Sequence, residues 1–245
     1  MTRWHQFQKS AEPCFRFLKA EDLMHATHIS LQHKYLYVET PKVACSTVKK
    51  ILIDAEYGGR VENTEMEYYH YREFSPLLNA RQVGPFDQFL ARKDVFKFCF
   101  VRNPYTRLLS CYLDKIAKRK GQEYQLMIQL GYGPFSDKVL SFAEFVEGVI
   151  QQPVQYMDHH WRTQYYATFQ EGIEYDFIGR FESIEDDLKN ILGKINSNFM
   201  KYWGEESRHG TKSQNYIDEY YSDKLEQIVF EIYRKDFEYF GYKRL

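Results

Sequence analysis

The most constraining feature of this sequence is an abrupt change of pattern within residues 35–50, YLYVETPKVACSTVKK. An apolar stretch typical of a strand leads through a short loop into a helical pattern that begins near residue 45. Such a connection directs backbone N–H groups toward one point at the positive end of the helix dipole. Lys42 adds a mobile cation, and Ser46 and Thr47 add hydroxyl donors. The pattern predicts an anion site, most naturally for phosphate.

This loop is compatible with one other interpretation, and a second is excluded. An ordinary strand–helix turn with a serine cap would look similar in sequence. A Walker A loop is excluded, because the spacing G-x-x-x-x-G-K-[ST] is absent.

A second strand–helix connection carries an arginine. Residues 95–101 have the pattern of a buried strand, and Arg102 follows directly at its carboxyl end. Pro104 stands where a helix would begin, a position that tolerates the missing N–H, and Ser110 lies about two helical turns further on. Because open α/β sheets bind ligands at the carboxyl ends of their strands, both connections point to one edge of one sheet.

These two segments resemble a known family. Residues 41–47 look like the 5′-phosphosulfate loop of sulfotransferases, and residues 102–110 look like their 3′-phosphate motif. The similarity is greatest to carbohydrate sulfotransferases of the chondroitin 4-O and HNK-1 type, in sulfotransferase family 2. Residues 160–164 and 175–188 extend the resemblance less specifically.

The resemblance implies transfer of a sulfuryl group from 3′-phosphoadenosine 5′-phosphosulfate (PAPS) to a hydroxyl of a carbohydrate or other acceptor. Adenosine 3′,5′-bisphosphate (PAP) would be the product, and no metal would be required. Lys42 would act on the leaving 5′-phosphate, and Arg102 and Ser110 would hold the 3′-phosphate. The remaining expected nucleotide contacts lie in the first loop and in a later basic loop: Val43, Ala44, Cys45, Ser46, Thr47, Arg208 and Lys212. That basic loop could equally be a mobile surface turn.

The reaction also needs a base for the acceptor hydroxyl. His70 is the only histidine between the two phosphate motifs, and related enzymes carry a catalytic histidine in this interval. His159 and His160 are rivals, and a structural or substrate-binding role for His160 is an alternative. A carboxylate, Glu67 or Glu73, also remains open as the base.

The order of elements predicts an α/β, P-loop-like three-layer fold with a mainly parallel central sheet flanked by helices. The 245 residues are expected to form a single domain, with residues 1–33 as a leader packed on the core. The expected strands span residues 34–39, 95–101 and 175–181. The expected helices span residues 45–57, 104–119, 141–150 and 217–237, with another from Ser183.

Composition limits the alternatives. A formal net charge of −1 gives no global field for nucleic acid. Lys49, Lys50 and Arg107 are expected mainly on solvated helix faces. The four cysteines have no metal-ligand spacing and are expected to be buried free thiols: Cys14, Cys45, Cys99 and Cys111.

The sequence shows neither a secretory signal nor a long apolar run, so a cytoplasmic, bacterial enzyme is expected. A truncated Golgi luminal domain is the alternative. Two other functions remain open: a nucleotide kinase, disfavoured by the missing Walker A loop, and a non-catalytic nucleotide- or glycan-binding relative.

Overall fold

A computed structural model describes residues 2–15, 17–59, 61, 69, 71–118, 131, 140–202 and 213–245. The chain divides into two compact units. Unit 1 comprises Met1–Val101 and Tyr166–His209, and unit 2 comprises Arg102–Tyr165 and Gly210–Leu245. Each unit is described by itself.

Unit 1 contains a four-stranded sheet in the order β1-β2-β3-β4. The strands are β1 (Thr27–Ser30), β2 (Tyr35–Val38), β3 (Phe96–Val101) and β4 (Phe177–Arg180). β2, β3 and β4 run parallel, whereas β1 pairs antiparallel with β2. The α/β class is therefore confirmed, and the sheet is mixed. Strand β1 was not anticipated, because residues 27–30 fall in the expected leader.

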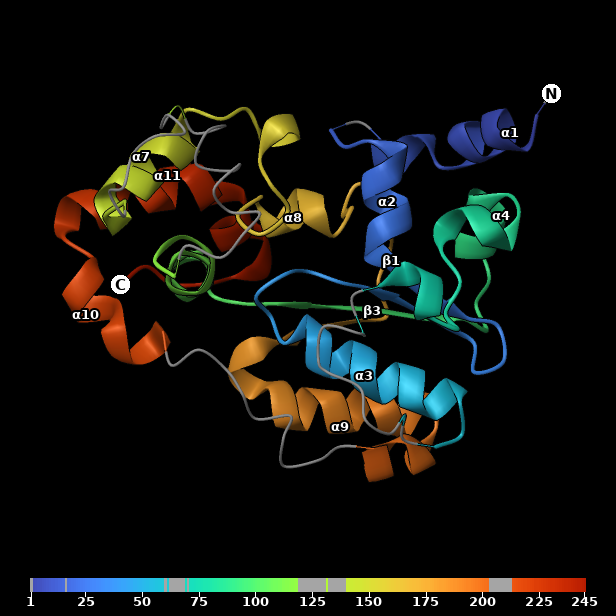
Figure 1. Cartoon of the computed structure of the whole chain (residues 1–245). Coiled ribbons are helices and arrows are strands. Elements are labelled where there is room, and N and C mark those ends of the chain that lie inside the picture. Colours follow the sequence, from blue (N-terminus) through green and yellow to red (C-terminus); the bar gives the residue numbers. More distant parts are fainter. Residues whose placement is uncertain are drawn as a thin grey trace. The chain divides into compact units, whose positions relative to one another are not determined.

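Helices cover both faces of this sheet (Figure 1). α3 (Cys45–Glu56) and α9 (Ile184–Ile195) pack on the face formed by the aromatic side chains of β2 and β3. α1 (Arg3–Ser10), α2 (Ala20–Ala26) and α4 (Phe86–Leu90) pack on the opposite face. Alternate residues of the central strands serve opposite faces, which explains why β2 and β3 are apolar without interruption.

The segment 175–182 contains strand β4 and joins it to the sheet. Asp176 binds both main-chain groups of Lys97 in β3. Its carboxylate accepts the Lys97 N–H over 2.7 Å, and its own N–H donates to the Lys97 carbonyl over 2.8 Å. A Cβ at Gly179 would lie 2.4 Å from the Phe100 ring, so only glycine fits there. The resemblance in this segment therefore has a packing explanation.

Unit 2 is built around α5 (Pro104–Cys111), which continues as a π-helical turn (Tyr112–Ile116). α7 (Phe142–Ile150) and α11 (Asp223–Phe240) lie next to each other (Figure 1). Both helices contribute to the same hydrophobic cluster as α5, which contains the buried Trp161. The expected helix 217–237 is two helices, α10 (Ile217–Tyr220) and α11, because Ser222 caps a new start by accepting the Leu225 N–H. In sequence, the boundary between the two units falls within the short helix α8 (Gln164–Ala167).

Candidate functional site

The loop between β2 and α3 has an unusual backbone. Lys42 and Ala44 adopt φ values of +69° and +62°, in the left-handed region that non-glycine residues seldom occupy. Each such residue costs about 1–2 kcal/mol. Left-handed residues in a short loop turn successive N–H groups toward a common side and form an anion-binding concavity. The strain therefore marks this loop as a candidate binding site.

Helix α3 begins at this loop without a side-chain cap. Its cap position is Ala44, which has no side-chain oxygen. The serine-capped turn considered as the alternative is therefore not what forms. The N–H groups in the first turn of a helix are the groups that donate to a bound anion.

The predicted loop residues divide by exposure. Val43, Cys45 and Thr47 are buried, whereas Lys42, Ala44 and Ser46 are partly exposed. Burial raises the pKa of the Cys45 thiol, consistent with a packing role and not with a reactive thiolate. All four cysteines are buried and free, as expected.

Two charged residues brace the loop from either end. Glu39 precedes the loop and Lys49 lies on α3, and their side chains meet at 2.6 Å between Oε2 and Nζ. Both are buried, so the expectation of a solvated face for Lys49 is wrong. The His28 imidazole also faces Glu39, at 3.2 Å, and the Arg72 guanidinium faces His28 at 2.7 Å.

Arg102, the predicted 3′-phosphate residue, directly follows β3 and belongs to unit 2. Its side chain is only 3% exposed. Nε donates to Thr106 Oγ1 over 3.0 Å, and a terminal nitrogen donates to Ser213 Oγ over 2.6 Å. Pro104 occupies the first turn of α5, as expected, and Asn103 caps the helix by accepting the Tyr105 N–H.

Ser110 is buried on α5, and Arg107 on the same helix is 1% exposed, so its expected solvated position is also wrong. The Arg107 guanidinium donates to the carbonyl oxygens of Arg162 and His159, over 2.7 and 3.2 Å. The helix of the 3′-phosphate motif thus holds the turn that carries His160.

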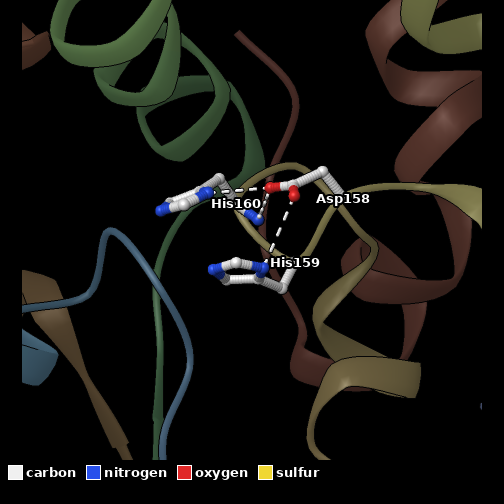
Figure 2. A group of neighbouring side chains, drawn as sticks. All are labelled: Asp158, His159 and His160. Carbon is white, nitrogen blue, oxygen red and sulfur yellow. Dashed lines mark hydrogen bonds and ion pairs between the residues drawn. The ribbon is translucent and has the colours of Figure 1, made fainter. Parts of the chain in front are cut away.

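Figure 2 shows the Asp158 carboxylate facing the imidazoles of His159 and His160. His160 Nδ1 lies 2.7 Å from Asp158 Oδ1, and the His160 N–H donates to the same oxygen over 2.9 Å. Burial raises the pKa of the Asp158 carboxyl, but the His160 hydrogen bond and the charges of both imidazoles bring it well below its usual range. Because the carboxylate holds Nδ1, Nε2 is the ring nitrogen of His160 that could bind a ligand or accept a proton.

The possible ligand atoms of these three residues lie within 4.8 Å of one another, close enough to hold one metal ion. The 2.7 Å contact between Asp158 and His160 has the length of a hydrogen bond. We therefore describe Asp158 and His160 as a carboxylate–histidine pair.

Several predicted residues fall outside the part of the chain that the structure describes: His70, Glu67, Arg208 and Lys212. Glu73 lies in an exposed 3₁₀ turn, Arg72–Phe74. The structure thus places the first loop in unit 1 and the residues Arg102, Ser110 and His160 in unit 2.

Sequence reasoning missed the residues that hold Arg102. Thr106 stands four positions after it, a spacing that would have been readable for a helix start. Ser213 gave no such signal, because its contact to Arg102 spans a long stretch of chain. Gln164 lies in the segment 160–164 that extends the resemblance, but nothing in that segment links it to Arg102 or to Asp236.

Comparison with known proteins agrees with the sequence resemblance. Carbohydrate sulfotransferase 14 from Danio rerio is 29% identical over 187 residues, which cover 73% of this chain and 50% of that protein. Carbohydrate sulfotransferase 11 from Rattus norvegicus is 26% identical over 253 residues, covering 93% of this chain and 69% of that protein. Carbohydrate sulfotransferase 8 from Homo sapiens is 26% identical over 241 residues, covering 87% and 54%. No solved structure is significantly similar to the chain.

The chain spans about half the length of carbohydrate sulfotransferase 14. The expectation of a bacterial, cytoplasmic enzyme is wrong, because these relatives are vertebrate carbohydrate sulfotransferases. None of the helices in the described residues has the length and apolar character needed to cross a membrane.

The Sulfotransferase family model matches residues 25–243, which include both predicted phosphate motifs and most of each structural unit. The chain therefore belongs to the sulfotransferase family.

Proposed function

We propose that this protein transfers a sulfuryl group from PAPS to a hydroxyl of a carbohydrate acceptor. The observation that carries the proposal is the strained loop at Lys42 and Ala44, which leads into the start of α3 in a chain of the sulfotransferase family. The relatives' names supply the acceptor class.

The residues present fit such a donor. In unit 1, a P-loop-like role for residues 41–47 follows from backbone N–H groups, the partly exposed Lys42 and the hydroxyls of Ser46 and Thr47. In unit 2, Arg102 supplies a guanidinium and Ser110 a hydroxyl for a phosphate. Arg208 and Lys212 remain sequence-based proposals for further nucleotide contacts.

In the proposed reaction, the acceptor oxygen forms a bond to sulfur while the bond from sulfur to the 5′-phosphate oxygen breaks. Negative charge then grows on that phosphate oxygen. Lys42 and the loop N–H groups would stabilise it most strongly in the transition state. The acceptor hydroxyl gives its proton to a base, for which His70 is the sequence-based candidate and His160 the rival.

A screen of carbohydrate acceptors with labelled PAPS tests this function directly. Mass spectrometry should detect acceptors that gain one sulfuryl group, together with stoichiometric PAP. Calorimetry without magnesium should show much tighter binding of PAP than of AMP. Equal affinity for the two nucleotides would remove the 3′-phosphate assignment, and binding of PAP with no turnover on any acceptor would leave a binding protein.

A further inference from the structure

The backbone of Arg102 is paired with one distant side chain. The Arg102 N–H donates to Gln164 Oε1 over 2.8 Å, and Gln164 Nε2 donates back to the Arg102 carbonyl over 2.7 Å. Gln164 is completely buried, and Arg102 is nearly so. Two bonds of opposite sense fix both the position and the rotation of this residue, as a neighbouring strand would.

Gln164 is itself held by a buried carboxylate. Asp236, on α11, accepts the Gln164 N–H over 2.8 Å through Oδ2 and the Tyr165 N–H over 2.8 Å through Oδ1. Gln164 Nε2 also donates to Asp236 Oδ2, over 3.4 Å. Asp236 is wholly buried, so water does not compete with these N–H groups for its carboxylate oxygens. The side chain of Gln164 therefore has a single supported orientation.

The guanidinium of Arg102 is held from its other end. Thr106 and Ser213 accept from it, and Ser213 Oγ in turn donates to the Thr106 carbonyl over 3.0 Å. Gln164 thus fixes the main chain of Arg102 while two hydroxyls fix its side chain. A buried arginine restrained at both ends is arranged before any ligand arrives, which lowers the ordering cost of binding an anion.

We propose that Gln164, oriented by Asp236, positions Arg102 for the 3′-phosphate of the nucleotide. The pair then determines selectivity for a nucleoside 3′,5′-bisphosphate over a 5′-monophosphate. This inference rests on the function proposed above and deepens it. Gln164 and Asp236 act through Arg102, so they are positioning residues and not catalytic ones.

Calorimetry on the full chain tests the inference with PAP and AMP as probes. Gln164→Met keeps the volume of the side chain and removes both bonds to Arg102. It should lower the ratio of the AMP to the PAP dissociation constant by about tenfold or more. Gln152→Met is the matched control: its Oε1 accepts from Trp161 Nε1 at 2.9 Å, elsewhere in the same unit, and the ratio should stay unchanged.

A double-mutant cycle separates positioning from general damage. In an Arg102→Ala background, Gln164→Met should no longer change the ratio, because its effect passes through Arg102. If Gln164→Met proves unstable, Asp236→Asn is measured by the difference between the melting-temperature shifts that PAP and AMP produce. That difference should shrink.

Two results would overturn the inference while leaving the proposed function intact. One is an unchanged ratio in Gln164→Met, which includes an equal loss of affinity for PAP and AMP, and the other is an unchanged difference in Asp236→Asn. Failure of the proposed 3′-phosphate site would instead appear in the unsubstituted protein, as equal affinity for PAP and AMP.

Discussion

Glu39 and Lys49 form a buried ion pair that joins the two ends of the candidate 5′-phosphate loop, with 2.6 Å between Oε2 and Nζ. The loop residues lie between these two positions in sequence, and two of them hold left-handed backbone conformations. Strained residues persist where the surroundings determine their conformation. We infer that this ion pair is part of what keeps the loop in shape.

Removing one partner of this pair should destabilise the protein strongly. Lys49→Met leaves the Glu39 carboxylate buried and poorly compensated, which should lower the free energy of unfolding by about 3–5 kcal/mol. Lys189→Met is the control, because Lys189 faces Asp186 at 3.8 Å on the surface and should contribute less than about 1 kcal/mol. Urea unfolding at pH 7 measures both. Similar losses for the two variants would contradict the role given to the buried pair.

His28 should make the free energy of unfolding depend on pH. Burial lowers the pKa of His28 from 6.5 to about 4, although Glu39 opposes the shift and Arg72 and Lys49 add to it. Between these values the unfolded chain binds a proton and the folded chain does not, so stability should fall as the pH drops from 6.5 toward 4. The full loss corresponds to about 3 kcal/mol.

His28→Gln tests this dependence, because glutamine can bond to Glu39 and Arg72 but does not titrate. The variant should show a shallower fall in the free energy of unfolding across this pH window. Urea titrations at several pH values give the slopes, and equal slopes for the two proteins would assign the pH dependence to other groups.

The elements that sequence predicted well are those whose signal is local. Neighbouring residues in the sequence are enough to predict the apolar strands β2 and β3, the start of α5 at Pro104 and the loop before α3. The predictions that failed concern residues whose contacts are distant in sequence. Nothing near Lys49 distinguishes a solvated helical lysine from one that meets a carboxylate across a loop, and its burial depends on Glu39.

The candidate site follows the same rule. Arg102 stood out as the residue after an apolar strand, whereas Gln164 and Asp236 look like ordinary polar helix residues until the fold brings them to it. The helix expected from Ser183 forms as α9, directly after this residue, but the serine hydroxyl does not cap it. The Ser183 hydroxyl donates to Asp187 Oδ2 over 2.9 Å, and no side-chain bond caps α9 there.

Arg102 should contribute to PAP binding through geometry as well as charge. Arg102→Ala should weaken PAP binding by about 1.5–3 kcal/mol, or about 10- to 150-fold, and leave AMP binding nearly unchanged. Arg102→Lys keeps the charge but loses the forked donor and the Nε bond to Thr106, so we expect it to recover only part of the affinity. Calorimetry gives all three values, and full recovery by lysine would show that charge alone matters.

Lys42 should act on turnover more than on nucleotide affinity. Its strongest interaction is expected with the charge that develops on the leaving phosphate oxygen, so Lys42→Ala should lower kcat by about 10²–10³-fold. The PAP dissociation constant should change far less. Steady-state kinetics on an acceptor found in the screen, together with calorimetry, separates the two effects. A raised KM with near-normal kcat would make Lys42 a ground-state binder.

The identity of the base can be decided by two histidine variants measured side by side. Replacing the base with alanine should lower kcat by about 10²-fold or more and leave the PAP dissociation constant unchanged. A base must be deprotonated to accept the acceptor proton, so the acidic limb of the pH–rate profile should vanish with it. The sequence points to His70, whereas His160 has a carboxylate partner that fixes its ring.

Asp158→Asn makes the comparison sharper. If His160 is the base, this variant should lower kcat as well, because the amide no longer favours the tautomer with the proton on Nδ1. If His70 is the base, His160→Ala and Asp158→Asn should raise KM for the acceptor and leave the acidic limb in place. His70→Ala with an unaltered limb would exclude His70. Retention of the limb in both histidine variants would transfer the role to a carboxylate such as Glu73.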